Sequence, residues 1–316
     1  MTGVAPDGSR PITAELVAVL VAVTGDEPRV LATRHARALP AGPFQPSHRS
    51  LQAGLRAWVE QQTHHPLGYV EQLYTFADRD RVDAAGAQTM SISYLGLTRE
   101  GEAADDTDAR WQSWYRYFPW EDQRIGPPAL IAGALEPALR DWAAAVASAG
   151  EREARQTRVD IMFGLGGHAW NEDLVLQRYE LLYEAALVPE ACVEGHAAPA
   201  LPDAAVGTAM AHDHRRILAT GVARLRAKIK YRPVVFELMP PAFTLLQLQQ
   251  AVEAIAGQRL HKQNFRRVIE QQELVEETGE VQAGGAGRPA KLVRFRRGVL
   301  QERAISGSKL PFARLV

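Results

Sequence analysis

The chain has 316 residues, 46% of them hydrophobic and 23% charged, which is about twice the length of a usual single domain. This composition excludes disordered and fibrous chains, and the longest apolar run, residues 16–23, is far shorter than the roughly 20 residues of a membrane span. With no secretory signal visible near the N-terminus and a single cysteine, Cys192, we expect a cytoplasmic protein with no membrane partner.

The net charge of −1 conceals an uneven distribution of charge. Residues 1–211 contain 17 arginines, no lysine and 28 acidic residues, whereas residues 212–316 contain 19 basic and 9 acidic residues. An acidic body joined to a basic module indicates a polyanionic partner, most often nucleic acid. Ordinary solvated surface charge is the alternative interpretation.

The N-terminal part of the sequence predicts a small sheet with one helix. Two runs rich in β-branched residues, 16–23 and 29–33, flank the turn Thr24–Gly25–Asp26 and predict an antiparallel pair. We expect a helix over residues 50–62 and two further strands over 70–76 and 90–97.

Residues 39–65, LPAGPFQPSHRSLQAGLRAWVEQQTHH, carry a degraded motif of pyrophosphate hydrolysis. With Gly42 as the first glycine, they fit the spacing of the Nudix pattern G-x5-E-x7-R-E-U-x-E-E-x-G-U, where U is apolar. Three positions beyond that glycine match the pattern, namely Arg56, Trp58 and Glu60. Among the departures, His48, Ala57 and Gln61 replace glutamates and Thr63 replaces the closing glycine.

The missing carboxylates decide what this motif can do. Pyrophosphate hydrolysis here needs carboxylates clustered one helical turn apart, because Mg²⁺ prefers hard oxygen ligands and must offset phosphate charge. One glutamate of four remains, and His48 is a softer, uncharged ligand. We therefore expect a pocket that binds its ligand without hydrolysing it, with no catalytic residue, no metal site and no required cofactor. In the alternative interpretation, Arg56 and Glu60 merely form a surface ion pair on the helix.

The middle and the linking segments are predicted to be helical. Residues 127–208 read as a helical insertion, with Asn171 as a helix cap and a loop over 196–207. Over residues 213–231, Leu218, Val222, Leu225 and Ile229 fall on one stripe, and basic side chains occupy much of the remaining surface. We expect this amphipathic basic helix to pack on the core or on a partner subunit and to link two domains.

Residues 243–297 predict a winged helix-turn-helix. Pro240–Pro241 ends the preceding segment, Thr244 and Gln247 form a capping box, and Gly257 stops the first helix. A second helix, 261–272, turns Phe265, Val268 and Ile269 inward, and a loop with four glycines, 279–289, joins two strands. Basic and amide side chains on such a helix suit phosphates and base edges in the major groove. Winged helices that dock proteins are the alternative.

Five segments together resemble a known family, the Nudix-related transcriptional regulators of NAD metabolism (NrtR), and most closely its NadQ-type branch. The residues that carry the resemblance are YVEQLYTFADRDR at 69–81, SISYLGLTRE at 91–100, residues 215–249, LHKQNFRRVIEQQELVEETGE at 260–280 and GRPAKLVRFR at 287–296. It implies an α+β chain, with a Nudix-like α/β/α sandwich at 10–238 that carries the insertion, followed by a winged-helix domain at 239–316.

The resemblance also implies a function. The chain would be a homodimeric repressor of NAD synthesis or salvage genes that binds a double-stranded operator and senses an adenine nucleotide, ATP or ADP-ribose. Its DNA-binding residues would be Lys262, Gln263, Asn264, Arg266, Arg267, Arg288 and Lys291. Candidate ligand-binding residues near the Nudix motif are Arg34, Arg37, His48, Arg56, Glu60 and Tyr69. The alternative is an enzyme, a Nudix-type ADP-ribose or nucleotide pyrophosphatase with residual metal-dependent activity.

Overall fold

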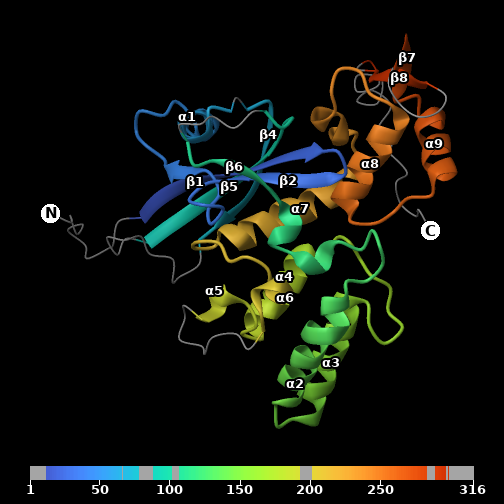
Figure 1. The fold of residues 1–316 in the computed structure, drawn as a ribbon. Coiled ribbons are helices and arrows are strands. Elements are labelled where there is room, and N and C mark those ends of the chain that lie inside the picture. Colours follow the sequence, from blue (N-terminus) through green and yellow to red (C-terminus); the bar gives the residue numbers. More distant parts are fainter. Residues whose placement is uncertain are drawn as a thin grey trace.

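The computed structural model describes residues 12–65, 67–77, 88–101, 107–192, 201–282, 289–296 and 298. A sheet with helices on both faces is followed by a helical insertion, and a smaller helical domain with a two-stranded wing completes the chain (Figure 1). This arrangement confirms the predicted α+β class and the α/β/α sandwich.

The sheet has six strands in the order β4-β5-β1-β2-β6, with β3 paired to one end of β1. Strands β1 and β5 run parallel and the other pairs are antiparallel, including the predicted hairpin of β1 and β2, in which Val21 faces Val30. The central strand is covered on both faces, and its apolar residues are therefore continuous rather than alternating. The strands are β1 (Ile12–Thr24), β2 (Glu27–Ala32), β3 (Ala41–Pro43), β4 (Tyr69–Phe76), β5 (Gln88–Leu97) and β6 (Arg110–Ser113).

Helices α1 (Leu51–Thr63) and α7 (His214–Ile229) cover opposite faces of the sheet (Figure 1). Leu55 and Val59 of α1 pack with the β1 side chains that point to one face, and α7 packs with those that point to the other. Helix α1 begins after Ser50, whose hydroxyl accepts a hydrogen bond from the Ala53 amide, and ends at His64 in the left-handed conformation. The predicted helix over 50–62 is thereby confirmed.

The insertion consists of short helices, and one pair of them projects away from the sheet (Figure 1). Its predicted helix start was wrong, because Asn171 accepts from the Asp173 amide in a turn and the helix begins only at Val175. Part of the predicted loop, residues 203–206, forms one helical turn, while 196–200 lie outside the described residues. Two short helices, η1 (Trp114–Arg116) and η2 (Pro119–Glu121), precede the insertion. The elements of the insertion are η3 (Ile131–Leu135), α2 (Glu136–Ala144), α3 (Ala149–Phe163), α4 (Val175–Glu184), α5 (Pro189–Cys192) and α6 (Asp203–Val206).

Helix α7 has the predicted apolar stripe, and several of its basic side chains are buried rather than exposed to solvent. Arg215, Arg226 and Lys228 are buried, and each pairs with a carboxylate of the preceding acidic part of the chain. The pairs made by basic residues of this helix and its C-cap are Arg215–Glu190, Arg216–Glu180, Arg226–Glu121, Lys228–Glu71 and Lys230–Glu172. Much of the basic excess after residue 211 is thus neutralised inside the protein. Residues 239–316 hold twelve basic and seven acidic residues, so the winged-helix part keeps a smaller positive charge.

The C-terminal elements form the predicted winged helix-turn-helix. Thr244 and Gln247 make the capping box of α8, and Gly257 ends that helix with a positive φ of 71°. Phe265 and Ile269 of α9 are buried, and the β7–β8 hairpin forms the wing. The elements are η4 (Val234–Leu238), α8 (Leu245–Ala256), α9 (Lys262–Gln271), β7 (Val275–Gln282) and β8 (Ala290–Phe295). None of the helices in the described residues is long and apolar enough to cross a membrane.

Candidate DNA-reading surface and effector pocket

Helix α9 presents a cationic face to solvent. Lys262, Arg266 and Arg267 are exposed on the side away from the buried Phe265 and Ile269. Within the described chain, none of these three basic side chains pairs with a carboxylate, whereas other basic side chains of this domain do. Cationic groups that have no internal partner are the ones available to phosphate.

Two amide side chains lie among these basic groups. Gln263 is exposed, and the half-buried Asn264 accepts a hydrogen bond of 2.7 Å from Nη2 of Arg267. Amides can pair with the edge of adenine, which makes these positions suited to reading sequence rather than charge. The structure therefore brings together all five predicted residues of the reading helix.

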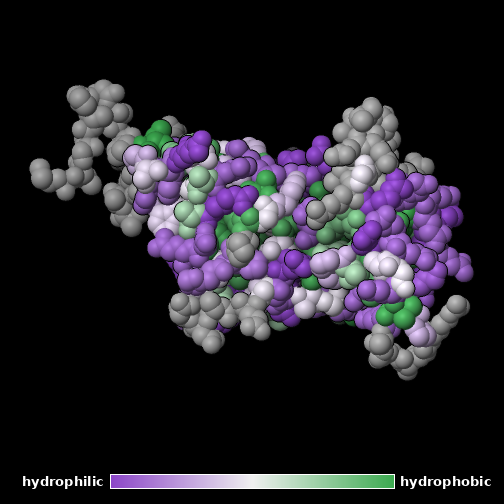
Figure 2. Space-filling model, turned by 90° about the horizontal axis from the view of Figure 1, so that it is seen from above, coloured by the Kyte–Doolittle hydropathy of each residue, from purple (hydrophilic) through white to green (hydrophobic). Residues whose placement is uncertain are grey.

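The wing carries basic residues that are already paired. Lys291 lies 2.7 Å from Glu277, and the wing also contains the pairs Arg294–Glu276 and Arg296–Glu273. Because the Lys291 and Glu277 side chains are 66% and 64% exposed, their pair contributes little stability, and phosphate can replace the carboxylate at small cost. Arg288, the predicted wing tip, lies outside the described residues. Seen from above, the surface at the winged-helix end is largely hydrophilic (Figure 2).

The loop that begins at Gly42 is held by close contacts within the motif. Gly42 packs against the Trp58 ring so closely that a Cβ atom there would lie 2.3 Å from it. The Trp58 indole donates a 2.9 Å hydrogen bond to the Pro43 carbonyl. His48, which replaces a glutamate, accepts from the Gln45 amide and lies against Gly54. These contacts explain why the motif spacing survives although most of its acids are gone.

Glu60 is the one glutamate that remains in the motif. Glu60 is exposed on α1 beside exposed Ala57 and Gln61, and the described residues contain no cluster of three or more His, Cys, Asp or Glu that could hold a metal. Arg56 does not form the alternative ion pair with Glu60. Its guanidinium donates instead to the carbonyls of Leu67 and Gly68 and stabilises the loop after α1.

A polar cavity of about 380 Å³ lies beside the motif, between the sheet, α1 and the start of α7. Its wall combines charged groups of both signs with two histidines from the first turn of α7 and the residues before it. The lining residues are Glu15, Thr33, Arg34, Leu39, Ala41, Gln62, Thr107, Asp108, His212 and His214. This size lies at the lower end of the usual range for small-molecule sites.

Hydrogen bonds fix the wall of this cavity. The Gln62 amide accepts from the Ala41 backbone N–H and donates to the Ala41 carbonyl, at 3.2 and 2.7 Å. The Leu39 amide donates to Nδ1 of buried His214 at 2.9 Å, and a neutral His214 ring therefore carries its proton on Nε2. Strand β3 and the first turn of α7 are thus held to a single geometry.

The turn that carries Arg34 is strained. Arg34, His35 and Ala36 have φ angles of 51°, 57° and 68°, three successive left-handed residues without a glycine. Such backbone costs about 1–2 kcal/mol per residue and persists only where its surroundings enforce it. Here the Arg34 amide donates a 2.6 Å hydrogen bond to Asp108, which also lines the cavity.

Of the six predicted ligand-binding residues, only Arg34 lines this cavity. Arg37 belongs to the same turn, but its exposed side chain is not part of the wall. His48, Arg56 and Glu60 belong to the motif loop and α1, outside the lining. Tyr69 lies across the sheet, where its hydroxyl donates to Glu71 and accepts from Lys228 of α7. Gln62, Asp108 and the two histidines were missed, and the only sequence signal was His212-Asp213-His214 at the start of the linking helix.

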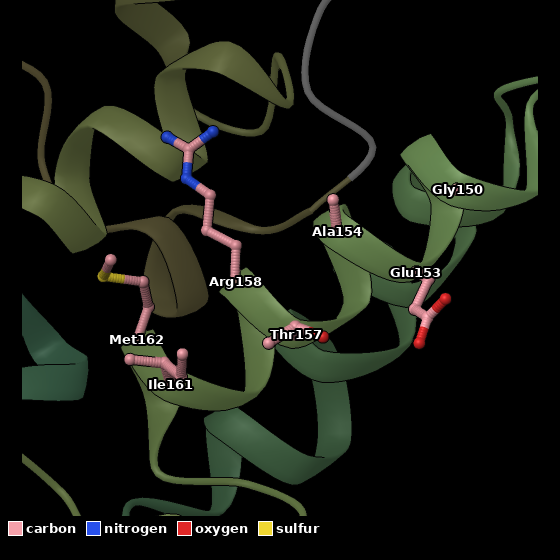
Figure 3. A pocket seen from close by; sticks show the side chains of 7 residues that line it. All are labelled: Gly150, Glu153, Ala154, Thr157, Arg158, Ile161 and Met162. Atoms are coloured by element: carbon pink, nitrogen blue, oxygen red, sulfur yellow. The ribbon is translucent and has the colours of Figure 1, made fainter.

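A larger hollow of about 560 Å³ follows the outer face of α3. All seven lining side chains come from this one helix, as the close view shows (Figure 3). The seven residues form an open groove without a second wall of polar groups, which a small-molecule site needs.

Comparison with known proteins places the two parts of the chain. Residues 235–295 match the family model of the NrtR DNA-binding winged helix domain. A curated relative, the ADPR responsive transcriptional repressor NtrR of Acinetobacter baylyi, is 43% identical over 86 residues, which cover 27% of this chain and 34% of that protein. The matched segment thus spans about a third of the relative's length.

Solved structures share the fold over nearly the whole chain. Shewanella oneidensis NrtR complexed with a 27mer DNA superimposes with a TM-score of 0.53 at 19% identity, covering 91% of this chain and 95% of that one. A MutT/nudix family protein of Enterococcus faecalis gives 0.52 at 16% identity, covering 91% and 88%.

The fold joins an α/β/α sandwich to a winged helix that has an exposed cationic face. This is the NrtR architecture, and the C-terminal domain belongs to the NrtR winged-helix family. The resemblance seen in the sequence is confirmed, while the narrower placement in the NadQ-type branch stays a prediction.

Proposed function

We propose that the chain is a transcriptional repressor whose Nudix-like domain binds ADP-ribose without hydrolysing it and thereby changes the affinity of the winged helix for DNA. The observation that carries the proposal is the cationic face of α9, in a domain that matches the NrtR DNA-binding family. The relative named as an ADPR responsive repressor and the Shewanella protein crystallised with DNA support it.

DNA binding follows from the side chains of α9. The helix enters the major groove, where Lys262, Arg266 and Arg267 contact phosphates or guanine, and Gln263 and Asn264 contact base edges. Lys291 and Arg288 of the wing add phosphate contacts. A homodimer places two such helices about 34 Å apart, one turn of a palindromic operator. The expected target genes are those of NAD synthesis or salvage.

ADP-ribose fits the chemistry of the cavity better than ATP does. Arg34 offers a guanidinium to the pyrophosphate, and Glu15 and Asp108 can accept hydrogen bonds from ribose hydroxyls. The same two carboxylates repel a triphosphate more strongly, because it carries more negative charge. Their presence therefore favours the sugar-terminated ligand over ATP.

The site also explains why ligand would alter DNA binding. His212 and His214 line the cavity, and α7 runs from them to the winged helix. A ligand shifts the equilibrium only if it binds one arrangement of α7 more tightly than another. Coupling of this kind is usually about 1–3 kcal/mol, which corresponds to a change in affinity of about 5- to 150-fold.

A fluorescence-anisotropy titration tests DNA binding. Labelled duplex from the protein's own promoter is compared with scrambled duplex at about 150 mM salt. We expect tighter binding to the promoter, and Arg266→Ala should weaken it about tenfold or more and lower the salt dependence by about one phosphate contact. Arg158→Ala, an exposed arginine of α3, is the control. Equal affinity for both duplexes would refute a sequence-reading repressor.

A second assay separates a sensor from an enzyme. ADP-ribose is incubated with the protein and Mg²⁺ or Mn²⁺, and AMP is measured. We expect no AMP, since Glu60 is the one glutamate left in the motif and no other acid assists it among the described residues. AMP release that disappears in Glu60→Gln would establish the pyrophosphatase instead.

A further inference from the structure

One buried carboxylate connects three parts of the molecule. Glu121, at the end of η2, is 1% exposed and accepts hydrogen bonds from two guanidinium groups. Arg178 of α4 approaches through Nε and Nη2 at 2.6 and 2.9 Å, and Arg226 of α7 through Nη1 at 2.5 Å. Burial by itself raises the pKa of Glu121, but the two arginines outweigh it and hold the carboxyl ionised.

Arg226 continues this connection into the winged helix. Its Nε donates a 2.8 Å hydrogen bond to the carbonyl of Ile255, in the last turn of α8. The final carbonyls of a helix have no partner within the helix and carry partial negative charge. Arg226 therefore caps α8 at the point where the chain turns toward α9, and Glu121 holds the capping group in place.

Two further contacts join the same turn to residues before the insertion. The backbone N–H of Gln123 donates a 2.8 Å hydrogen bond to the Gly257 carbonyl. The Tyr115 hydroxyl donates a 2.7 Å hydrogen bond to the Ala254 carbonyl. A Cβ atom on Gly257 would lie 2.4 Å from the Glu121 carbonyl oxygen. The turn between α8 and α9 is thus docked on the Nudix-like domain, backbone against backbone.

The insertion supports this docking through Arg178. Its Nη1 donates to the carbonyls of Met162 and Asn171, and its guanidinium stacks on the Trp170 ring at 3.8 Å. The segment between α3 and α4 therefore immobilises the arginine that orients Glu121. This contact gives the insertion a role in the geometry of the whole chain.

We propose that Glu121 and Arg226 are positioning residues that fix the DNA-reading helix relative to the Nudix-like domain, with Arg178 of the insertion holding Glu121. The inference rests on the proposed function for its consequence, the DNA affinity, but not for the docking itself. Helix α9 begins only a few residues after Gly257, so a change in this dock reorients its reading face. Paired reading helices require a fixed spacing on their operator.

Hydrogen exchange at the backbone N–H of Gln123 reports on the docking without involving DNA. Hydrogen–deuterium exchange of the full-length protein is followed in the peptide that contains this amide. Glu121→Gln keeps the shape of the side chain but removes its charge. In Arg226→Lys, the single ammonium cannot reach both the Glu121 carboxylate and the Ile255 carbonyl. Loss of a charged hydrogen bond should speed exchange about tenfold or more in each variant and weaken promoter binding comparably.

A matched control uses another buried pair of α7. Arg215 lies 3.1 Å from Glu190, both side chains are nearly inaccessible, and in the described chain neither forms a hydrogen bond or ion pair with the winged helix. Glu190→Gln should leave exchange at Gln123 at the wild-type rate. Equal acceleration in this control would overturn the proposal, because exchange would then report general loosening.

Tyr115→Phe is a milder second variant should Glu121→Gln not fold. It deletes one hydroxyl from the same dock, and exchange should rise about two- to tenfold. Unchanged exchange in every folded variant overturns the positioning role, as does faster exchange with unchanged promoter affinity. If exchange rises in the variants but the wild-type protein does not bind its promoter, the docking contacts are supported and the proposed repressor function is refuted.

Discussion

At the scale of single residues, the buried arginines carry the largest energetic consequences. Arg178 is fully buried, and both Arg178 and Arg226 form salt bridges with Glu121. Removing one member of a buried pair costs about 3–5 kcal/mol, because the remaining charge stays buried without its full compensation. Arg178→Met should therefore lower the free energy of unfolding by about 3 kcal/mol, since Arg226 still compensates in part. Urea denaturation measures the loss.

The control is an arginine of the same insertion in an exposed pair. Arg158 and Glu184 have side chains that are 38% and 45% exposed. Solvent screening limits such a pair to about 1 kcal/mol at most, and Arg158→Met should scarcely shift the urea midpoint. Equal losses in the two variants would mean that burial of the Glu121 cluster contributes no additional stability.

The ionisation of Glu121 also makes stability depend on pH. Burial raises the pKa of Glu121, but Arg178 and Arg226 lower it by a larger amount. The pKa in the folded protein therefore lies below the usual 4.5. In acid the unfolded chain then binds a proton that the folded protein does not, so this stabilisation is present above about pH 4.5 and disappears as the pH falls through the folded pKa. Urea midpoints measured downward from neutral pH should drop less steeply in Glu121→Gln than in wild type. Identical slopes would contradict this.

Sequence reasoning succeeded for residues whose partners are close in the chain. The Thr244–Gln247 capping box and the left-handed Gly257 depend on contacts within a few residues and appear as predicted. Periodicity places Arg226 outside the apolar stripe, but it does not show that this side chain is buried. Its partner Glu121 lies 105 residues earlier in the sequence, and no local pattern indicates that pairing.

At the scale of elements, α7 packs on the core of its own chain, which is one of the two arrangements that its pattern allowed. Leu225 is fully buried within a single chain, between the sheet and the rest of the core. A charged residue there would disturb the fold and would not report on dimerisation alone. We expect Leu225→Ala to cost about 2–5 kcal/mol of unfolding free energy, as core truncations do. Its exposed neighbour Arg224 is the control, and Arg224→Ala should change stability by less than about 0.5 kcal/mol.

Among the elements, strands β1, β2, β4 and β5, helix α1 and the winged helix could be predicted because each has a strong local signal, whereas the short strands β3 and β6 were not predicted. Apolar runs, caps and glycine turns specified the predicted elements to within a few residues. The polar cavity could not be predicted, because its wall combines β1, the β2–β3 turn, α1 and the start of α7. Arg34 was found because it adjoins the Nudix motif, whereas His214 lies 175 residues from its partner Leu39.

At the scale of the whole molecule, the charge asymmetry has two separate uses. Basic residues of α7 neutralise acids in the preceding part of the chain, and the cations of α9 remain exposed at the surface. The sequence shows the total excess but not its division between internal pairs and surface. A net charge therefore indicates a polyanionic partner only for the part of the charge that folding leaves exposed.

The same whole-molecule view predicts how an effector signal enters. Arg34 lines the cavity at one end of α7, and Arg226 contacts α8 near the other. ADP-ribose at about 100 times its dissociation constant should add about 2.7 kcal/mol to wild-type stability, seen as a rise in melting temperature. Arg34→Ala should abolish both this rise and the effect of ADP-ribose on promoter binding, while binding without effector stays unchanged.

Arg37 supplies the matched control for that experiment, because it shares the strained turn but its side chain does not line the cavity. Arg37→Ala should retain both the thermal shift and the response on DNA. If Arg37→Ala abolishes the thermal shift and the response on DNA while Arg34→Ala retains both, the effector site lies outside this cavity. Loss in both variants would instead show that the turn itself, rather than one guanidinium, is what the ligand requires.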